Sequence, residues 1–481
     1  MAQRKQKIFS NFIWRFAERC GAQAVKLIVE LVLARFLLPD DYGTIALVTV
    51  FITILNVFVD SGLGNALIQK KNADDLDFSS VFYFNLIWCF ILYLLLFAFA
   101  PVISIFYGIP ELTVIVRVLG ITVLISGLKN VQQAFVSRNM LFKKFFFATL
   151  GGTFGAAILG ITMAYFGFGV WALVAQQLFN TAMDTLILWI TVKWRPKKVF
   201  SVQRLKVLFN YGWKLLASGL LETIYNNIRS LVTGKLYTAS DLAFYNQGDK
   251  LPNIIVGNIN NSIDSVLLPV MSNEQDNVEQ IKEITRKSIK ISTYVMAPLM
   301  MGLAVTADTL IVLILTEKWL PCVFFLKIFC VTYMFQPIHT ANLNAIKALG
   351  RSDLFLKLEV WKKVVGLILL CSTMWISVEA MAYSSFVSGI LAQIINSWPN
   401  KKLLNYSYLE QLKDIIPSIL LAVFMGVCIY PISLLHLNHI LLLTIQIVLG
   451  ASIYIVGSII VKIDSFQYLW GIVKSILKRS K

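Results

Sequence analysis

The stretch SSVFYFNLIWCFILYLLLFAFAPVISIF, residues 79–106, contains no charged side chain over 28 consecutive positions. A helix needs about 20 predominantly apolar residues to cross the hydrocarbon core of a bilayer. Only helices and closed barrels satisfy their backbone polar groups inside that core, and one unbroken apolar run of this length is typical of a helix. We therefore expect residues 79–106 to span a membrane.

Other segments repeat this pattern in weaker form, so the sequence predicts an all-α polytopic membrane protein with about fourteen transmembrane helices. The first, seventh and eighth segments are the most polar of the set. The expected spans lie at residues 9–37, 43–67, 79–106, 112–136, 146–167, 169–192, 210–234, 242–271, 287–315, 319–346, 356–377, 379–399, 414–435 and 439–461.

The composition fits a protein embedded in a membrane. Hydrophobic residues make up 57% of the 481 residues and charged residues 14%, whereas a soluble domain is about 45–50% apolar and about 25% charged. Soluble enzymes, fibrous proteins and disordered chains are thereby excluded. The formal net charge of +17 is explained by Lys and Arg in cytoplasmic loops, so we expect no nucleic-acid partner.

The loops between the expected spans alternate in charge. With the N-terminus inside the cell, roughly thirty Lys and Arg residues fall on the inner side and about three on the outer side, as the positive-inside rule requires. Both termini are therefore expected in the cytoplasm. All outer loops are short, and the tail FQYLWGIVKSILKRSK (466–481) is amphipathic, which predicts a helix on the inner membrane surface.

A weak internal repeat has an offset of about 200 residues, a pattern typical of duplicated transporter halves. ARFLLPDDYGTIA (34–46) aligns with GKLYTASDLAFYN (234–246), which places Asp41 on Asp241. The copies are separated by an even number of spans and so share one orientation. This predicts two six-helix lobes related by a pseudo-two-fold axis along the membrane normal.

A second match joins SGLGNALI (61–68) to NSIDSVLL (261–268). The repeat therefore predicts three regions. They are an N-terminal lobe at residues 1–200 with six spans, a C-terminal lobe at residues 201–412 with six spans, and residues 413–481 with two extra helices and the cytoplasmic tail.

The first and seventh expected spans, which begin the two repeats, each carry a polar stripe. Its members recur at three- and four-residue steps and so share one helical face. The stripe of the first span consists of Arg19, Gln23, Lys26 and Glu30, and that of the seventh consists of Glu222, Asn226 and Arg229. These residues are our candidates for a substrate-binding central cavity.

A charged side chain at the bilayer centre costs about 2.5–3.5 kcal/mol on insertion scales, so these residues should face protein or water. One explanation is a hydrated cationic cavity, and arginine suits a phosphate group there because its planar fork donates two hydrogen bonds at once. The alternative is internal pairing, such as Lys26 with Glu30 or Glu222 with Arg229. Residues near the span ends can also reach the interface.

Three further residues are candidates for coupling transport to an ion. Asp60 and Asp264 occupy near-equivalent positions in the two repeats, and His339 lies in the tenth span. Buried carboxylates can carry protons or coordinate Na⁺. The alternatives are capping or pairing of the two aspartates with inner Lys and Arg residues, and a hydrogen-bonded interior histidine. The sequence shows no nucleophile–base arrangement and no metal-ligand spacing, so we expect no catalytic or metal site.

Three stretches resemble a known family. They are LARFLLPDDYGTIALVTVFITILNVFVDSGLGNALIQKK (33–71), QQAFVSRNMLFKKF (132–145) and NAIKALGRSDL (344–354). They are similar to the Wzx-type polysaccharide exporters, or O-antigen flippases, of the multidrug/oligosaccharidyl-lipid/polysaccharide superfamily. Among these exporters, the chain resembles the colanic acid and teichuronic acid exporter-like members. The patterns D-x-GL-x-x-ALIQ (60–69) and A-x-x-x-R-x-M-x-F-K (134–143) carry the resemblance.

This resemblance implies a V-shaped transporter like the lipid II flippases and multidrug transporters of that superfamily. It implies movement of an undecaprenyl-diphosphate-linked oligosaccharide from the inner to the outer leaflet of a bacterial inner membrane. Alternating access coupled to a proton or sodium gradient is implied, with no bound cofactor. Arg19, Lys26 and Arg229 would bind the diphosphate, and the helices within 414–461 would guide the lipid chain. A polysaccharide polymerase or chain-length regulator is an implied partner.

Two other functions are considered. A drug/cation antiporter of the same superfamily would favour an acidic or aromatic cavity, whereas this one is basic. A membrane-embedded glycan polymerase or ligase would need an outer loop that carries Arg or His near the lipid-linked donor. Because every outer loop is short, we expect a transporter and not an enzyme.

Overall fold

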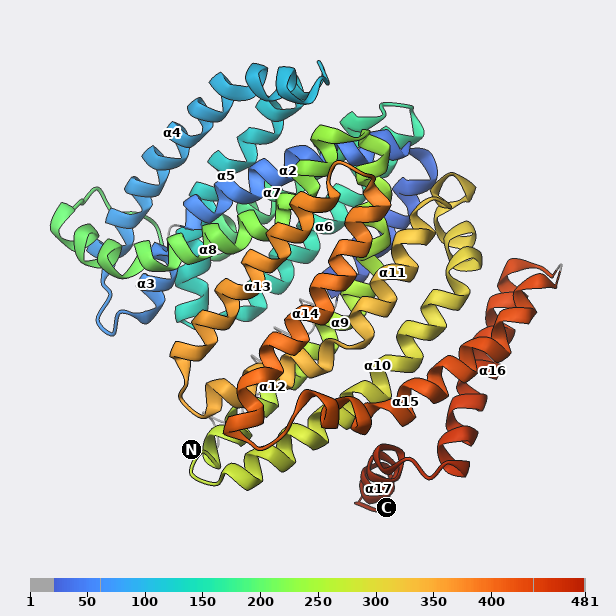
Figure 1. Cartoon of the computed structure of the whole chain (residues 1–481). Helices are drawn as coiled ribbons and strands as arrows, with labels where there is room; N and C mark the ends of the chain where they lie inside the picture. Colours follow the sequence, from blue (N-terminus) through green and yellow to red (C-terminus); the bar gives the residue numbers. More distant parts are fainter. Residues whose placement is uncertain (1–20, 61, 436, 480–481) are drawn as a thin grey trace. The chain divides into compact units, whose positions relative to one another are not determined.

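The computed structural model describes residues 21–60, 62–435 and 437–479, and every regular element in these residues is a helix (Figure 1). Ten of the helical segments are long and apolar enough to cross a membrane. The prediction of an all-α polytopic membrane protein is therefore confirmed. The helices α7 (Val170–Thr191), α8 (Val202–Leu236) and α13 (Ser352–Thr373) are also long enough to span but are more polar. The count of about fourteen spans stays a prediction.

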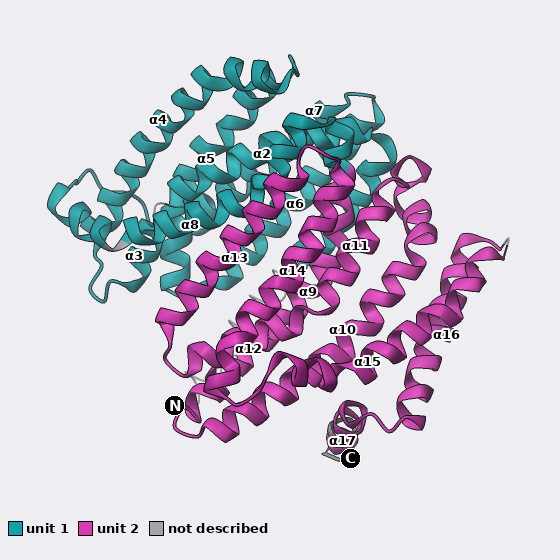
Figure 2. Cartoon of the chain, in the orientation of Figure 1, with its two compact units in different colours: residues 1–243 teal, residues 244–481 magenta. Residues whose placement is uncertain are grey.

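The chain forms two compact units, residues 1–243 and 244–481 (Figure 2). Unit 1 contains a helix over residues 21–36 within its described part. The other helices of unit 1 are α2 (Pro39–Asp60), α3 (Leu63–Gln69), α4 (Asp75–Tyr107), α5 (Leu112–Arg138), α6 (Phe142–Tyr165), α7 and α8. The first turn of α9 (Ala239–Asn273) also belongs to unit 1.

Unit 2 contains the rest of α9 and the following helices. These are α10 (Val278–Leu315), α11 (Cys322–Met334), α12 (Gln336–Ala348), α13, α14 (Val378–Leu403), α15 (Tyr408–Ile429), α16 (His439–Ile460) and α17 (Asp464–Arg479), with short 3₁₀ turns at Glu317–Trp319 and Tyr430–Leu434. The internal repeat predicted three regions with different boundaries, at residues 1–200, 201–412 and 413–481. These regions and the two-lobe layout stay a prediction. By packing, α8 belongs with α2, α3 and α4 of unit 1.

Local capping sets where several helices begin and end. The side chain of Asp74 accepts from the backbone N–H of Asp77 at the start of α4, and Asp77 returns the bond in a capping box. The same helix ends at Gly108, whose φ of 71° is readily adopted only without a Cβ. Ser407 and Glu410 form a second capping box that starts α15.

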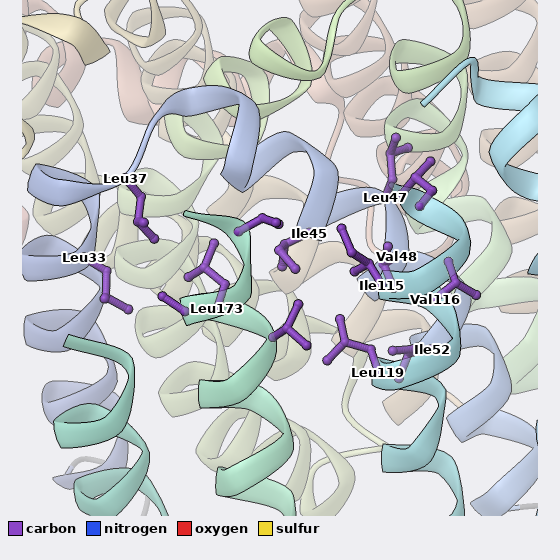
Figure 3. Packing of buried hydrophobic residues seen from close by; sticks show 14 of the residues in the cluster. Leu33, Leu37, Ile45, Leu47, Val48, Ile52, Ile115, Val116, Leu119 and Leu173 are labelled. Carbon is purple, nitrogen blue, oxygen red and sulfur yellow. The ribbon is translucent and has the colours of Figure 1, made fainter. Parts of the chain in front are cut away.

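A buried hydrophobic cluster of unit 1 brings several helices together (Figure 3). Leu33 comes from the helix over residues 21–36, Leu47 from α2, Leu119 from α5 and Leu173 from α7. In a bilayer the lipid tails are as apolar as leucine, so tight van der Waals packing drives such association. The cluster thereby fixes how α2 and α5 present the polar side chains described below.

The amphipathic tail predicted from the sequence forms the helix α17. Lys290 on α10 donates to the Asp464 carboxylate at 2.6 Å, and Tyr294 on the same helix lies against the Phe466 ring. Tyr468 and Trp470 remain exposed. An exposed aromatic pair on a helix beside lysines is typical of a segment at a membrane surface.

Candidate functional site

Six of the seven predicted cavity residues lie within the described part of unit 1. Arg19 lies outside the described residues. Gln23 and Lys26 are exposed and Glu30 is half-buried on the helix over residues 21–36. On α8, Glu222 and Asn226 are exposed, and Nδ2 of Asn226 donates to Oε1 of Glu222 at 3.1 Å. That the two stripes line one cavity stays a prediction.

Arg229 has a distinctive environment on α8. The side chain is half-buried, and its Nε and Nη2 atoms are buried without a hydrogen-bond partner in the part of the chain that the structure describes. A buried donor that lacks an acceptor costs about 1–3 kcal/mol, and more when it is charged. A guanidinium with unused donors can pair with two oxygens of a phosphate or carboxylate group. That Arg229 binds the substrate stays a prediction.

The candidate coupling residue Asp60 has a partner in another helix of unit 1. Nδ2 of Asn130 on α5 donates to Oδ1 of Asp60 at 2.6 Å. Asn130 in turn accepts from Nδ2 of Asn85 on α4 at 3.4 Å. Asp60 is exposed, whereas Asn130 and Asn85 are buried. The exposed carboxylate of Asp60 is thus held in place by Asn130, which is buried together with Asn85.

Asp264 repeats this arrangement in unit 2. Nδ2 of Asn344 on α12 donates to Oδ1 of Asp264 on α9 at 2.5 Å. Asp264 is exposed and Asn344 is buried. The sequence reasoning proposed both aspartates but missed their asparagine partners. An alignment of NVQQA (130–134) with NAIKA (344–348), which each begin with Asn and end with Ala, could have found them.

His339 lies inside unit 2, where Nδ1 of its ring lies 2.7 Å from Nδ2 of the buried Asn396. The ring therefore has a hydrogen-bond partner, as the structural alternative expects. The coupling role of His339 stays a prediction. Within the described ranges, no group of three or more His, Cys, Asp or Glu side chains is placed to hold a metal ion.

The two sequence patterns that carry the family resemblance meet in unit 1. Arg138, at the end of α5, donates to the backbone oxygens of Leu67, Lys70 and Lys71 at 2.7, 2.5 and 2.9 Å. Lys70 also reaches the fully buried carboxylate of Asp77 at 2.6 Å. Arg138 and Lys70 therefore hold the loop after α3 in place, a role that sequence reasoning alone had not recognised.

A bundle of helices that crosses a membrane many times, with arginine and carboxylate side chains inside its spans, is the architecture of a membrane transporter. The family follows from the sequence comparison. This chain belongs to the polysaccharide biosynthesis protein family, whose model matches residues 32–324.

Individual relatives agree with this assignment. The teichuronic acid biosynthesis protein TuaB of Bacillus subtilis (strain 168) is 26% identical over 400 residues, which cover 80% of each chain. The succinoglycan biosynthesis transport protein ExoT of Rhizobium meliloti (strain 1021) is 23% identical over 309 residues, which cover 64% of this chain and 63% of that protein. The fold is similar to the lipid II flippase MurJ in an inward closed conformation, with a TM-score of 0.77 and 14% identity over 94% of this chain and 99% of that one.

Proposed function

We propose that this protein is a flippase for lipid-linked oligosaccharides. It moves undecaprenyl-diphosphate-linked repeat units from the inner to the outer leaflet of a bacterial inner membrane, with both of its termini in the cytoplasm. Membership of the polysaccharide biosynthesis protein family and similarity to TuaB and ExoT support the substrate class. The similarity to MurJ supports the fold that such transport needs.

The observation that carries the proposal is the state of Arg229. Two of its guanidinium nitrogens are buried and have no acceptor among the described residues. A diphosphate supplies charged, paired oxygens that satisfy such a fork in two parallel hydrogen bonds. Asn226 and Glu222 lie one and two turns away from Arg229 on the same face of α8 and suit the hydroxyl groups of a sugar.

The physical need for such a protein is clear. A sugar diphosphate headgroup cannot cross hydrocarbon unaided, because each unsatisfied polar group costs several kcal/mol there. A closable polar cavity removes that cost, while the polyprenyl chain stays in the bilayer. Alternating access of the two repeats moves the headgroup without making or breaking a covalent bond. The protein is thus a transporter and not an enzyme.

The proposal includes a proton or sodium gradient as the energy source, since concentrating headgroups on one side requires work. No bound cofactor is needed. A polymerase and a chain-length regulator are the expected partners on the outer side, where the flipped units are consumed.

The experiment is to measure the sidedness of lipid-linked oligosaccharide in a strain that lacks the gene. Completed units should accumulate in the inner leaflet, and the wild-type gene should clear them. If single units instead reach the outer leaflet and stay unpolymerised, the flippase proposal is wrong and the protein acts in polymerisation.

The variant Arg229→Ala should leave export at least about tenfold lower, the loss expected for one charge-assisted contact. Arg229→Lys should recover part of it. Arg117→Ala is the matched control, because that intramembrane arginine already donates to the Phe97 carbonyl oxygen at 3.3 Å and packs on the Phe97 ring. Equal loss of export in both alanine variants, at equal membrane levels, would contradict the role of Arg229.

A further inference from the structure

Unit 1 has a groove between α2 and α4 with a volume of about 230 Å³. Every residue that lines it is apolar. Phe51, Ile54 and Leu55 are the lining residues of α2, and Leu95 and Phe99 are exposed lining residues of α4. Pockets for drug-sized ligands have about 300–1,000 Å³, so this groove suits a section of one flexible apolar chain.

One end of the groove lies close to α8. The ring of Phe51 meets the ring of Tyr107 edge to face, with 6.1 Å between the ring centroids. The hydroxyl group of Tyr107 donates to the backbone oxygen of Leu231 on α8 at 3.4 Å. A lining residue of the groove is therefore one aromatic contact away from the turn of α8 that contains Arg229.

The packing of α2 against α8 places Arg229 beside the same part of α2. A Cβ on Gly219 of α8 would contact Val57, and a Cβ on Gly234 would overlap Leu47. Arg229 lies between these two glycines in the sequence of α8. It therefore lies at the level of the middle of α2, which is the part of this helix that lines the groove.

The guanidinium group and the groove need opposite kinds of ligand. Two buried nitrogens of Arg229 have no acceptor in the part of the chain that the structure describes, whereas the groove offers only apolar contacts. A single molecule with an anionic head and a long apolar chain satisfies both. Arg229 lies seven residues, or about 10 Å, before the end of α8. Bilayer phospholipids keep their phosphates outside the hydrocarbon core, so a headgroup that is carried through the membrane suits this depth better.

We propose that the groove between α2 and α4 binds the isoprenoid chain of a polyprenyl diphosphate while the diphosphate is at Arg229. The inference rests on the proposed flippase function and gives the lipid chain of its substrate a site in unit 1. The family resemblance instead implies the helices within residues 414–461, which belong to unit 2. The test must therefore separate these two positions.

The probe is geranylgeranyl diphosphate with a photoactivatable diazirine in its chain, added to the purified full-length protein in detergent. Illumination should attach the label to peptides of α2 and α4 that line the groove, as identified by mass spectrometry. Excess undecaprenyl diphosphate should suppress this labelling, and the same excess of phosphatidylglycerol should not. Equal suppression by phosphatidylglycerol would show that the groove takes bulk lipid and would overturn the proposal.

Two variants fill the groove from its two walls, Ile54→Trp on α2 and Leu95→Trp on α4. Each should lower labelling of the groove about tenfold, the loss expected when two methylene groups of the chain are excluded from an apolar site. Leu94→Trp is the matched control, because Leu94 is 48% exposed and Leu95 is 50% exposed, but only Leu95 lines the groove. Two blocking variants keep the result interpretable if one of them folds poorly.

Equal labelling of the groove in Leu95→Trp and Leu94→Trp would overturn the proposal. Labelling confined to α15 and α16 would also overturn it, but that result leaves the flippase proposal intact because the protein still binds the polyprenyl diphosphate. If undecaprenyl diphosphate competes for no label anywhere on the protein, both the groove and the proposed substrate class are contradicted.

Discussion

Nη1 of Arg138 donates to the backbone oxygen of Lys70 at 2.5 Å, although the two residues are 68 positions apart in the chain. The same guanidinium reaches the backbone oxygens of Leu67 and Lys71. The last carbonyl groups of a helix have no partner within it, and α3 ends at Gln69. Arg138 therefore caps the end of α3 and ties the loop after α3 to α5.

This geometry predicts that Arg138→Lys destabilises the protein. The planar guanidinium group of arginine spreads its donors over separate nitrogens, whereas the single ammonium group of lysine cannot contact the same three carbonyl oxygens. Each hydrogen bond to a charged group contributes about 1.5–3 kcal/mol, so Arg138→Ala should cost at least that amount. Thermal unfolding of the purified protein measures both. Arg351→Lys is the control, since Arg351 is an exposed residue paired with the exposed Asp353. A wild-type unfolding temperature for Arg138→Lys would contradict this role.

The fully buried carboxylate of Asp77 should be even less tolerant of change. It pairs with Lys70 at 2.6 Å and takes part in the capping box that starts α4. Removing one partner of a buried ion pair costs about 3–5 kcal/mol, because the other charge is left unpaired. We expect Asp77→Ala to reduce the yield of folded protein sharply, as measured by size-exclusion chromatography. Asp353→Ala, which breaks an exposed pair, should leave the yield of folded protein close to that of the wild type.

Gly43 lies where the first turn of α2 meets the first turn of α9. A Cβ at this position would be 1.8 Å from the backbone oxygen of Ala239, and Oγ of Ser240 donates to Asp40 at 2.7 Å beside it. Gly43→Ala should therefore separate the two turns and lower the unfolding temperature. Gly257→Ala is the control, because a Cβ there meets nothing within 4 Å. That change should be neutral or stabilising by up to about 1 kcal/mol. Equal behaviour of the two variants would disprove the close contact.

The attachment of α17 should weaken in acid. The hydrogen bond and charge of Lys290 hold the pKa of Asp464 below its ordinary value. A lowered native pKa means that the stabilisation is complete above the unfolded pKa of about 3.9 and is lost as the pH falls through the native pKa. The Asp464 carboxylate is largely exposed, so the effect should be at most about 1 kcal/mol.

Hydrogen exchange of residues 464–471, corrected for the intrinsic rate at each pH, measures this attachment. Asp464→Asn at neutral pH should exchange up to about fivefold faster than the wild type, the factor that corresponds to 1 kcal/mol. The wild type should approach the variant as the pH falls below 4. If exchange of residues 464–471 in Asp464→Asn changes with pH as much as it does in the wild type, the ion pair between Asp464 and Lys290 does not hold α17.

The internal repeat was partly visible in the sequence, and the structure shows that two aligned aspartates have the same capping role. Asp41 and Asp241 were aligned from their neighbours alone. The carboxylate of Asp41 accepts from the backbone N–H of Leu38 at 2.9 Å, and that of Asp241 accepts from Thr238 at 3.1 Å. Both aspartates therefore cap the start of a helix in the same way. Short-range capping is predictable because donor and acceptor are three residues apart.

The predicted cavity residues show the opposite case. The helical spacing of Glu222, Asn226 and Arg229 placed them on one face of α8, and the bond between Asn226 and Glu222 agrees with that spacing. The unsatisfied nitrogens of Arg229 were not predictable. Whether these nitrogens find an acceptor depends on the helices that pack around Arg229. The spacing of residues within α8 contains no information on those helices.

The sequence by itself determined that the protein is an all-helical membrane protein, and it determined the family, because the length of an apolar run and a local motif are properties of neighbouring residues. Tertiary structure alone decided the partners of the charged and polar side chains. Asn130 binds Asp60 across 70 residues and Asn344 binds Asp264 across 80. Such pairs form only when the packing of helices brings distant positions within about 3 Å, the range of a hydrogen bond.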